Sequence, residues 1–247
     1  MAINPVEKIM ETLHEDYPVT DVRICQRSVM VKSKRLGLAY LFPRDPSSKG
    51  KRSQIRNCGS LTKLGAKELS AYALSDDLTE AAIGIAAINS LIDIDETKIQ
   101  VRNGKKSLYE RCAGKRVAMI GHFKFAEELK KLCAHLDILE LQPSPGDLPA
   151  SAADEVIPLA EVVIITGTTL INGTFAHIAG LARNAFASLL GPSSIMSPVL
   201  FEYGIDEICG SRVIDDEMVV RFVSEGGSFR DLSGVEQIVL SRKEGNR

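Results

Sequence analysis

The sequence predicts an α/β protein with two domains, a small α+β domain in residues 1–112 and a Rossmann-like domain with a mainly parallel sheet in residues 113–247. Three observations lead to this fold class. The chain has 247 residues, a length at which one hydrophobic core usually divides into two. Its first half has the pattern of a helix, a run of short strands and two helices. From Arg116 the order strand, loop, helix repeats, which is typical of a parallel sheet covered by helices.

The first half begins with a helix and an antiparallel meander. Residues 4–14 fit a helix because Pro5 suits its first turn and Ile9, Met10 and Leu13 form an apolar stripe. Three short segments follow that are rich in branched residues and separated by turn-forming or charged positions. They are residues 19–25, 28–31 and 37–42. We therefore expect a small antiparallel sheet.

A basic loop and two helices complete the first half. Residues 43–57 are rich in proline, serine, glycine and positive charge, which is typical of a solvated surface loop or of a lid that meets an anionic ligand. Helices are expected over residues 66–74 and 77–92. The helix over residues 77–92 is expected to be buried against a sheet, because its middle, AAIGIAAIN, is almost wholly small and apolar. Asn89 ends that stretch, so its amide is expected either to pair with backbone or to face a pocket.

The second half alternates strands and helices. Residues 93–115 are polar without a sustained period, so we expect them to connect the domains, with the boundary near residues 111–114. Strands are expected over residues 117–120, 138–141, 162–165, 188–190 and 207–209. Helices are expected over residues 126–135, 153–159, 174–185 and 216–224.

The composition excludes several classes of protein. Hydrophobic residues make up 45% of the chain and charged residues 25%, with a net charge of -2, which is not the balance of a nucleic-acid-coating chain. The first residues lack the basic start and apolar core of a signal peptide, and no apolar run approaches the roughly 20 residues that span a bilayer. We therefore expect a cytoplasmic protein that binds neither membrane nor nucleic acid. A homodimer is expected only on the base rate of soluble oligomers.

The cysteines argue against a disulfide framework and against a zinc knuckle. The chain has five cysteines, far apart and without a C-x-x-C pair. We expect reduced thiols.

The loops after the predicted strands carry the candidate ligand-binding residues, since ligands of open parallel sheets bind beyond the carboxyl ends of the strands. Gly121 takes the place of the first glycine of a dinucleotide fingerprint, but the full G-x-G-x-x-G is absent because His122 and Phe123 follow. Glu140 stands about 20 residues on, where a carboxylate commonly binds an adenosine ribose. A solvated strand-end carboxylate is the alternative.

Two further loops combine glycines with hydroxyl groups. TGTTLINGT, residues 166–174, precedes a predicted helix, so its N–H groups and hydroxyls are expected to hold an anion or a polar ligand; a helix cap formed by Asn172 or Thr174 is the alternative. GPSS, residues 191–194, is a second candidate turn. The candidate ligand-binding residues are Asn89, Gly121, His122, Glu140, Thr166, Gly167, Thr168, Asn172, Thr174, Gly191, Pro192 and Ser193.

Two histidines of these loops are candidate metal ligands or acid–base groups. His122 follows the first strand of the parallel sheet and His177 follows the TGTTLINGT loop, and imidazole serves either role at neutral pH. A polar pocket wall is the alternative, and for a metal we favour His122 over His177. No H-E-x-x-H, G-x-S-x-G, P-loop or triad pattern is present in the sequence, so no catalytic residue is assigned and the question of a reaction stays open.

Five segments in order resemble the DUF364 family. They are VAMIGHF (117–123), LELQPSPGDLP (139–149), ITGTTLINGT (165–174), LLGPSS (189–194) and EGG (225–227). Upstream, AAIGIAAINSLI (81–92) resembles the end of the DUF4213 domain that commonly precedes DUF364. The resemblance implies an enolase N-terminal-like domain joined to a Rossmann-like domain, with a site in the cleft between them. It also implies a role with heavy metals or small metal-binding molecules.

The expected function is therefore recognition of a small polar or anionic metabolite or a metal chelate in the interdomain cleft. The sequence offers no thiolate cluster for a soft metal, so a chelator or a metal complex is favoured over metal storage. An enzyme that uses an adenosine-containing cofactor such as S-adenosylmethionine, with Glu140 on the ribose, is the alternative. A third hypothesis is a scaffold or sensor that changes domain closure when a ligand binds.

Overall fold

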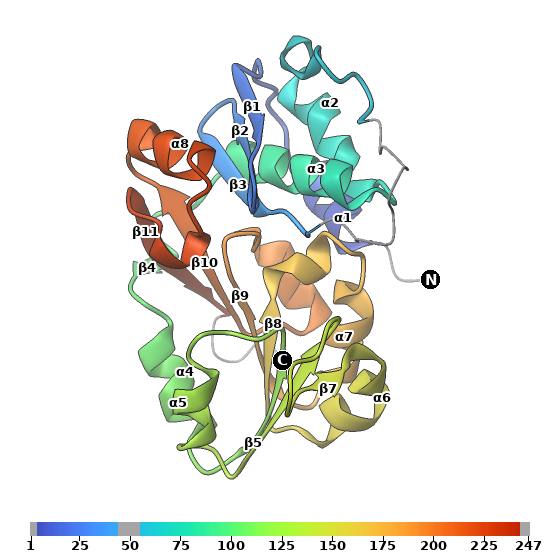
Figure 1. The fold of residues 1–247 in the computed structure, drawn as a ribbon, viewed down its shortest axis with the longest axis vertical. Coiled ribbons are helices and arrows are strands. Elements are labelled where there is room, and N and C mark those ends of the chain that lie inside the picture. The colour runs from blue at the N-terminus through green and yellow to red at the C-terminus, as the bar shows by residue number, and fades with distance from the viewer. Residues whose placement is uncertain (1–3, 44–54, 243–247) are drawn as a thin grey trace.

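A small antiparallel sheet forms the upper part of the molecule in Figure 1. The computed structural model describes residues 4–43 and 55–242. Helix α1 (Pro5–Glu11) precedes the three strands, which lie in the order β1-β2-β3. The strands are β1 (Asp21–Ile24), β2 (Ser28–Lys32) and β3 (Leu36–Tyr40). The predicted meander is confirmed.

Helices lie on one side of this sheet, and the longest of them contacts β2 and β3 at very short range. The helices are η2 (Leu61–Lys63), α2 (Ala66–Ser70), η3 (Ala71–Leu74) and α3 (Leu78–Leu91). A Cβ atom added to Gly37 of β3 would lie 2.1 Å from the carbonyl oxygen of Ala86, and one added to Gly84 would lie 1.9 Å from the backbone nitrogen of Ala73. The expected close contact between helix and sheet is thus made through Gly37, whereas Gly84 faces the neighbouring helix η3. Both positions require glycine.

The second sheet has eight strands in the order β4-β11-β10-β9-β8-β5-β6-β7. The run from β10 to β7 is parallel, and β11 and β4 are antiparallel additions at one edge. The strands are β4 (Ile99–Val101), β5 (Arg116–Ile120), β6 (His135–Glu140), β7 (Leu148–Pro149), β8 (Val162–Thr166), β9 (Phe186–Leu190), β10 (Glu207–Val213) and β11 (Val235–Ser241). The predicted α/β class with a mainly parallel sheet is confirmed. The strand order reverses between β5 and β8, so a topological switch point lies between them.

Helices connect these strands along the chain. They are α4 (Lys105–Cys112), α5 (Ala126–Lys130), η4 (Ala150–Ala152), α6 (Ala153–Val156), η5 (Ile157–Leu159), η6 (Gly167–Leu170), α7 (Phe175–Leu181), η7 (Pro198–Tyr203), α8 (Asp216–Ser224) and η8 (Phe229–Asp231). Two predicted helices were too long. The helix expected over residues 126–135 ends at Lys130, because His135 already pairs with Arg116 in the sheet. The helix expected over residues 174–185 ends at Leu181, shortly before β9 begins.

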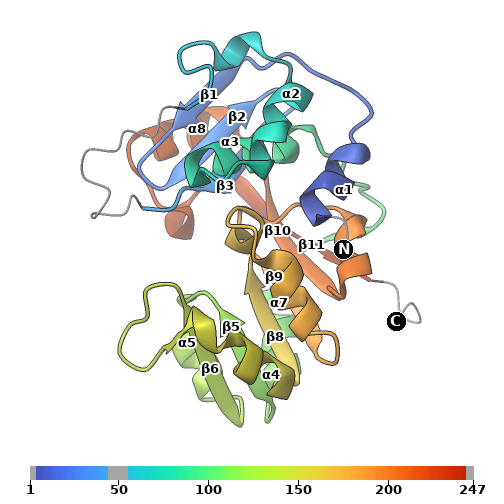
Figure 2. The same ribbon diagram turned by 90° about the vertical axis from the view of Figure 1, so that its right-hand side faces the viewer.

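Helix α8 covers the other face of the small sheet, although it belongs to the second half of the chain (Figures 1 and 2). Alternate residues of a strand point to opposite faces, so Val29 packs in the cluster with α3 while Met30 faces the other way. Met30 and Leu38 pack against Val219 and Val223 of α8. The small sheet is therefore buried on both faces.

One hydrophobic core runs through both halves of the molecule. A single cluster of buried residues includes Val6 and Leu69 from the first half and Ala118 and Leu189 from the large sheet. Large apolar interfaces of this kind oppose relative motion of domains. The interface therefore gives no support to a mechanism of domain closure.

The connecting segment is more ordered than the sequence indicated. Residues 93–115 were expected to connect the domains because no sustained period is visible in them, and in the structure β4 pairs with β11 and α4 packs against the large sheet through Leu108 and Cys112. Both elements precede the predicted boundary after residue 112 and join the large sheet. The boundary itself stays a prediction.

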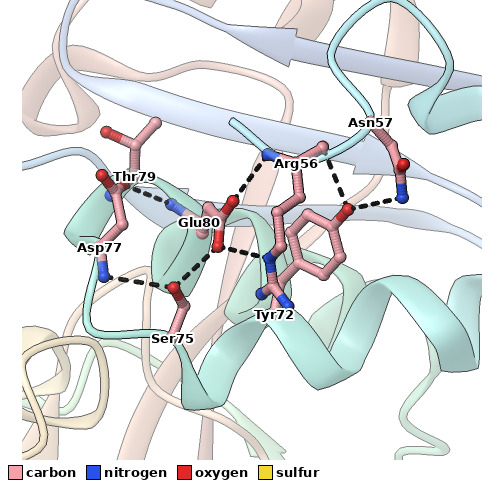
Figure 3. A network of polar contacts seen from close by, with 7 residues as sticks. All are labelled: Arg56, Asn57, Tyr72, Ser75, Asp77, Thr79 and Glu80. Carbon is pink, nitrogen blue, oxygen red and sulfur yellow. Dashed lines mark hydrogen bonds and ion pairs between the residues drawn. The ribbon is translucent and has the colours of Figure 1, made fainter. Parts of the chain in front are cut away.

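A buried glutamate fixes the chain where the basic loop rejoins the small domain (Figure 3). Residues 44–54 of the predicted basic loop lie outside the described residues. Glu80, whose side chain is 6% exposed, accepts hydrogen bonds from the backbone N–H of Arg56 at 2.7 Å, from Arg56 Nε at 2.8 Å and from Ser75 Oγ at 2.7 Å. The Arg56 guanidinium stacks on the Tyr72 ring, whose hydroxyl donates to the Arg56 carbonyl. Residue 56 is thereby held at the start of α3.

Candidate functional site

Three predicted loops meet at the carboxyl ends of β5, β8 and β9. Gly121 follows β5 with φ +92°, and a Cβ atom added to it would lie 3.1 Å from Thr166 Cγ2. A Cβ atom added to Gly167 would lie 2.6 Å from the backbone nitrogen of Ser194. The loop after β8 is therefore packed between the other two, beside the switch point, which is where ligands of open parallel sheets bind. We call the three loops, residues 121–122, 166–168 and 191–194, the switch-point loops.

The small sheet reaches these loops through Ser193. Its side-chain oxygen, buried with the residue 1% exposed, accepts a hydrogen bond of 2.8 Å from the backbone N–H of Tyr40 at the end of β3. Pro192 is half-buried, and an added Cβ atom at Gly191 would have no atom within 4 Å. Ser193 therefore joins the two sheets, while Gly191 borders open space.

The threonines of the second loop form a local hydroxyl network. Thr166 Oγ1 lies 3.1 Å from Thr168 Oγ1 and accepts the Thr168 N–H at 3.4 Å. The Thr169 hydroxyl donates to the Thr166 carbonyl. Thr166 and Thr168 are both half-buried residues.

Asn172 and Thr174 form a local turn before α7, and Thr174, the N-cap residue, makes no side-chain capping bond, so the helix-cap alternative is not borne out. Asn172 Oδ1 accepts the Thr174 N–H at 3.2 Å and the Thr174 hydroxyl at 2.7 Å, just before α7. Helix α7 has seven residues, too short for its dipole to add a strong anion site. A ligand-binding role for these two residues stays a prediction.

Glu140 and His122 are fixed to each other at the end of the sheet. Glu140 Oε1 accepts the backbone N–H of His122 at 2.6 Å, and Oε2 accepts the N–H of Leu141 at 3.2 Å. Glu140 thus has a structural role in the loop after β5, and the binding of an adenosine ribose stays a prediction. The geometry adds no observation in favour of that cofactor.

The sequence reasoning missed Asp147, which faces the ring of His122. Its Oδ2 lies 3.1 Å from His122 Nδ1 and also accepts the N–H of Ser144 at 3.1 Å. The Asp147 side chain is 4% exposed and that of His122 is 41% exposed. The P-S-P-G-D turn was a signal for local structure, but nothing in it indicated which side chain the aspartate would meet.

Asn89 makes its hydrogen bond to strand β3 of the small sheet. Its Nδ2 donates to the carbonyl of Leu38 at 3.0 Å, which agrees with the backbone-paired alternative. Within the described ranges, no hydrogen bond joins Asn89 to the switch-point loops. Its role as a ligand residue stays a prediction.

Direct chelation of a free metal ion by the protein has little support. In the part of the chain that the structure describes, no group of three or more histidine, cysteine, aspartate or glutamate side chains is placed to hold a metal. Burial raises the pKa of Cys112 to about 12, and burial followed by the nearby Glu207 carboxylate raises the pKa of Cys209 to about 12. Neither thiol therefore ionises readily in the metal-free protein. His177 pairs with the exposed Asp154 at 3.3 Å.

A separate groove of about 1370 Å³ lies beside the start of β10, and none of the predicted site residues lines it. Its walls include Asp95, Lys98, Arg183, Phe201, Tyr203 and Arg242. This volume exceeds the roughly 300–1,000 Å³ of ordinary small-molecule pockets, and the groove lies at the amino end of a strand, away from the edge where α/β sheets bind ligands. The switch-point loops therefore remain the better candidate.

No helix among residues 4–43 and 55–242 is long and apolar enough to cross a membrane.

Comparisons with known proteins agree with this fold. Residues 106–241 match the family model DUF364, described as "Putative heavy-metal chelation", and residues 6–92 match DUF4213, which has the same description. An uncharacterised protein of Methanocaldococcus jannaschii is 25% identical over 241 residues, which cover 91% of each chain.

Two solved structures have similar folds. A DUF364-family protein of unknown function from Desulfitobacterium hafniense is 25% identical and has a TM-score of 0.79, with 96% of each chain covered. A second DUF364-family protein of unknown function, from Pyrococcus horikoshii, is 17% identical with a TM-score of 0.77 and covers 97% of this chain and 98% of its own. The matched family model spans more than half of the chain, so this protein belongs to the DUF364 family, with a DUF4213 region preceding the DUF364 region.

Proposed function

We propose that the protein binds a small polar or anionic metabolite, or a small metal chelate, at the seam between its two sheets. The observation that carries this proposal is the meeting of the three switch-point loops with the end of β3. Gly121, Thr166 and Gly167 are in direct contact range, and Ser193 ties the group to Tyr40. Glycine turns and hydroxyls at such an edge supply donors for a polar ligand.

The donor set favours a ligand that brings its own metal coordination. A soft metal held by the protein alone would need several thiolates, but Cys112 and Cys209 are buried thiols with a pKa of about 12. The family description concerns heavy-metal chelation. A metal complex or a free chelator satisfies both observations, because its metal contacts are its own and its periphery is polar.

The first test identifies what the protein carries. Native mass spectrometry and elemental analysis are performed on the same untagged preparation. A bound organic molecule, with or without an equivalent of metal, is the expected result. Several metal ions per chain without any organic molecule would contradict the proposal, since this would indicate metal storage by the protein itself.

The second test locates the ligand. Thr168→Val removes one hydroxyl at nearly constant volume from a switch-point loop, and Thr20→Val is the matched control because that hydroxyl bonds to Lys32 in the small sheet. We expect about a tenfold loss of affinity for the identified ligand in Thr168→Val, since a lost hydrogen bond is worth roughly 1.4 kcal/mol. Unchanged binding in Thr168→Val, measured by calorimetry, would place the ligand elsewhere.

A further inference from the structure

His122 and Asp147 form a histidine–carboxylate pair at the edge of the large sheet. His122 follows β5, and Asp147 precedes β7, whose two residues pair with Leu139 and Glu140 at the end of β6. Both side chains therefore lie near the carboxyl ends of β5 and β6. Nδ1 of the ring lies 3.1 Å from the Oδ2 atom of the carboxylate. A carboxylate only accepts hydrogen bonds, so Nδ1 must carry the proton that it shares with Asp147. The other ring nitrogen, Nε2, is then the basic atom of the neutral imidazole.

The carboxylate that sets this tautomer is itself fixed. The Asp147 side chain is 4% exposed, and its Oδ2 also accepts the Ser144 N–H at 3.1 Å. The Asp147 N–H donates to the Ser144 carbonyl at 2.9 Å, which closes the turn. On the other side, the backbone of His122 is held by Glu140 at 2.6 Å. The backbone that carries the His122 ring and the carboxylate that contacts the ring are therefore both held in place.

The His122 ring is partly exposed to solvent. The His122 side chain is 41% exposed, and no hydrogen bond to Nε2 is made by any residue within 4–43 or 55–242. A histidine that donates one ring N–H to a carboxylate and presents the other nitrogen is the usual arrangement of a metal ligand, since the carboxylate orients the ring and raises its basicity.

The surroundings limit what kind of metal species would bind. Among the described side chains no group of three or more potential ligands surrounds a common point, so a bare ion would find too few donors. A metal that already has most of its ligands needs only one more. Imidazole is the natural donor for copper, nickel and zinc in such a complex.

We propose that His122 Nε2 occupies the open coordination position of a small metal chelate, and that Asp147 is the positioning residue that fixes the ring for this role. The neutral Nδ1–H tautomer carries no proton on Nε2, so in this form the imidazole displaces a water molecule from the metal without a proton transfer. This inference rests on the proposed function, to which it adds the coordinating atom and the coordination mode.

The other histidine–aspartate pairs of the chain provide matched comparisons. His177 contacts Asp154 at 3.3 Å and His135 contacts Asp137 at 2.9 Å, both through Nε2. The Asp154 side chain is 67% exposed, so its hold on His177 is weakened by solvent. His177 is thus an exposed histidine with a carboxylate partner but without a buried, fixed one.

The test uses soluble copper(II)–iminodiacetate as the probe, a complex with three donor atoms and a vacant position. Binding to full-length protein is followed by paramagnetic broadening of the histidine ring signals, and the tautomers are read from 15N shifts of the same rings. We expect His122 to be an Nδ1–H tautomer and to broaden at lower probe concentration than the other histidines. His122→Asn keeps an N–H donor for Asp147 but lacks Nε2, so it should abolish the high-affinity site. His177→Asn should leave that site unchanged.

Asp147→Asn tests the positioning role separately. We expect a mixed or reversed His122 tautomer and an affinity for the probe about 10–100-fold weaker, the range found when such partners of metal-bound histidines are removed. Because Asp147 is buried, the variant is first checked for an unchanged circular dichroism spectrum; if it fails this check, the 15N tautomer of wild-type His122 and the His122→Asn titration decide the matter.

Equal broadening of all histidines, or unchanged probe affinity in His122→Asn, would overturn this inference. A natural ligand that binds the wild type and His122→Asn equally but is lost in Thr168→Val would leave the proposed function standing and refute only the role of His122. If neither His122→Asn nor Thr168→Val loses binding of the natural ligand, both the proposed function and the role of His122 are refuted.

Discussion

The buried carboxylate of Glu80 offers a quantitative test of how the small domain is held together. Glu80→Gln keeps the shape of the side chain but replaces one acceptor oxygen by an NH2 group that faces the Arg56 Nε–H and the Ser75 hydroxyl. Ser75 can rotate its hydroxyl proton away, so the principal loss is the charge-assisted bond to Arg56. Bonds of this kind contribute roughly 1.5–3 kcal/mol, and the 57% exposure of the Arg56 side chain favours the lower end.

We therefore expect Glu80→Gln to lower the free energy of unfolding by about 1.5–2 kcal/mol at pH 7. For a chain of this length, that corresponds to a decrease in Tm of roughly 3–8 °C. Urea denaturation followed by circular dichroism measures the difference. Glu128→Gln is the control, because Glu128 also accepts a bond from a tyrosine hydroxyl and pairs with a lysine, but its side chain is 57% exposed. We expect little change in that variant.

The pH dependence of the stability difference between wild type and Glu80→Gln provides a second test. Burial alone would raise the pKa of Glu80, but the hydrogen bonds from the Arg56 backbone, from Ser75 and from the Arg56 guanidinium together lower it below 4.5. A lowered folded-state pKa means that the stabilisation is complete above the unfolded pKa and is lost as the pH falls through the folded value. The gap between wild type and Glu80→Gln should therefore shrink as the pH falls from 7 into the acid range, through the lowered folded-state pKa of Glu80. A gap that is absent at pH 7, or that persists unchanged in acid, would refute this account of the network.

Other buried groups lead to three more predictions. Ser193→Ala leaves the Tyr40 N–H without its acceptor and should lower the unfolding free energy by about 1–3 kcal/mol in urea titrations; a change near zero would mean that water replaces the hydroxyl. Met30→Ala removes a fully buried side chain between β2 and α8 and should lower stability by roughly 2–5 kcal/mol in one transition seen alike by circular dichroism and tyrosine fluorescence, whereas two separated transitions would contradict a shared core. The exposed Cys58 should react with a thiol reagent in the folded protein, while Cys112, with its pKa raised to about 12, should react only after denaturation; rapid labelling of both would contradict the burial of Cys112.

The parallel strands β5, β6, β8, β9 and β10 were predictable from short, mainly apolar runs between loops, whereas the two-residue strand β7 was not predicted. The segment VVII at β8 has no other stable place than the centre of a covered sheet, and it lies there fully buried. β11 was not predicted, because its sequence VEQIVLS carries polar residues and its pairing with β10 and β4 is set by the fold. β4 has three residues, too few for any periodicity to be visible.

The sequence predicted which loops were candidates for the site, but it did not predict the contacts between those loops. The position of Gly121 and of the threonine-rich loop follows from where strands end, which the sequence indicates. The bond from Tyr40 to Ser193 and the pair formed by His122 and Asp147 depend on which loops become neighbours in space. A local stretch of sequence does not indicate which distant loop will lie beside it in the fold. The turn that Asn172 forms with Thr174 is, in contrast, a local contact between residues two positions apart.

The cover that α8 provides for the small sheet has a consequence for synthesis on the ribosome. The sheet is complete once Tyr40 has emerged, but Met30 and Leu38 on its outer face pack against residues 219 and 223, which are translated about 180 positions later at roughly 5–20 residues per second. For about ten seconds or more, the nascent chain would present an apolar strand surface with nothing to cover it. Nascent chains of this protein should therefore bind chaperones until α8 leaves the exit tunnel, and the release of these chaperones should coincide with the docking of that helix.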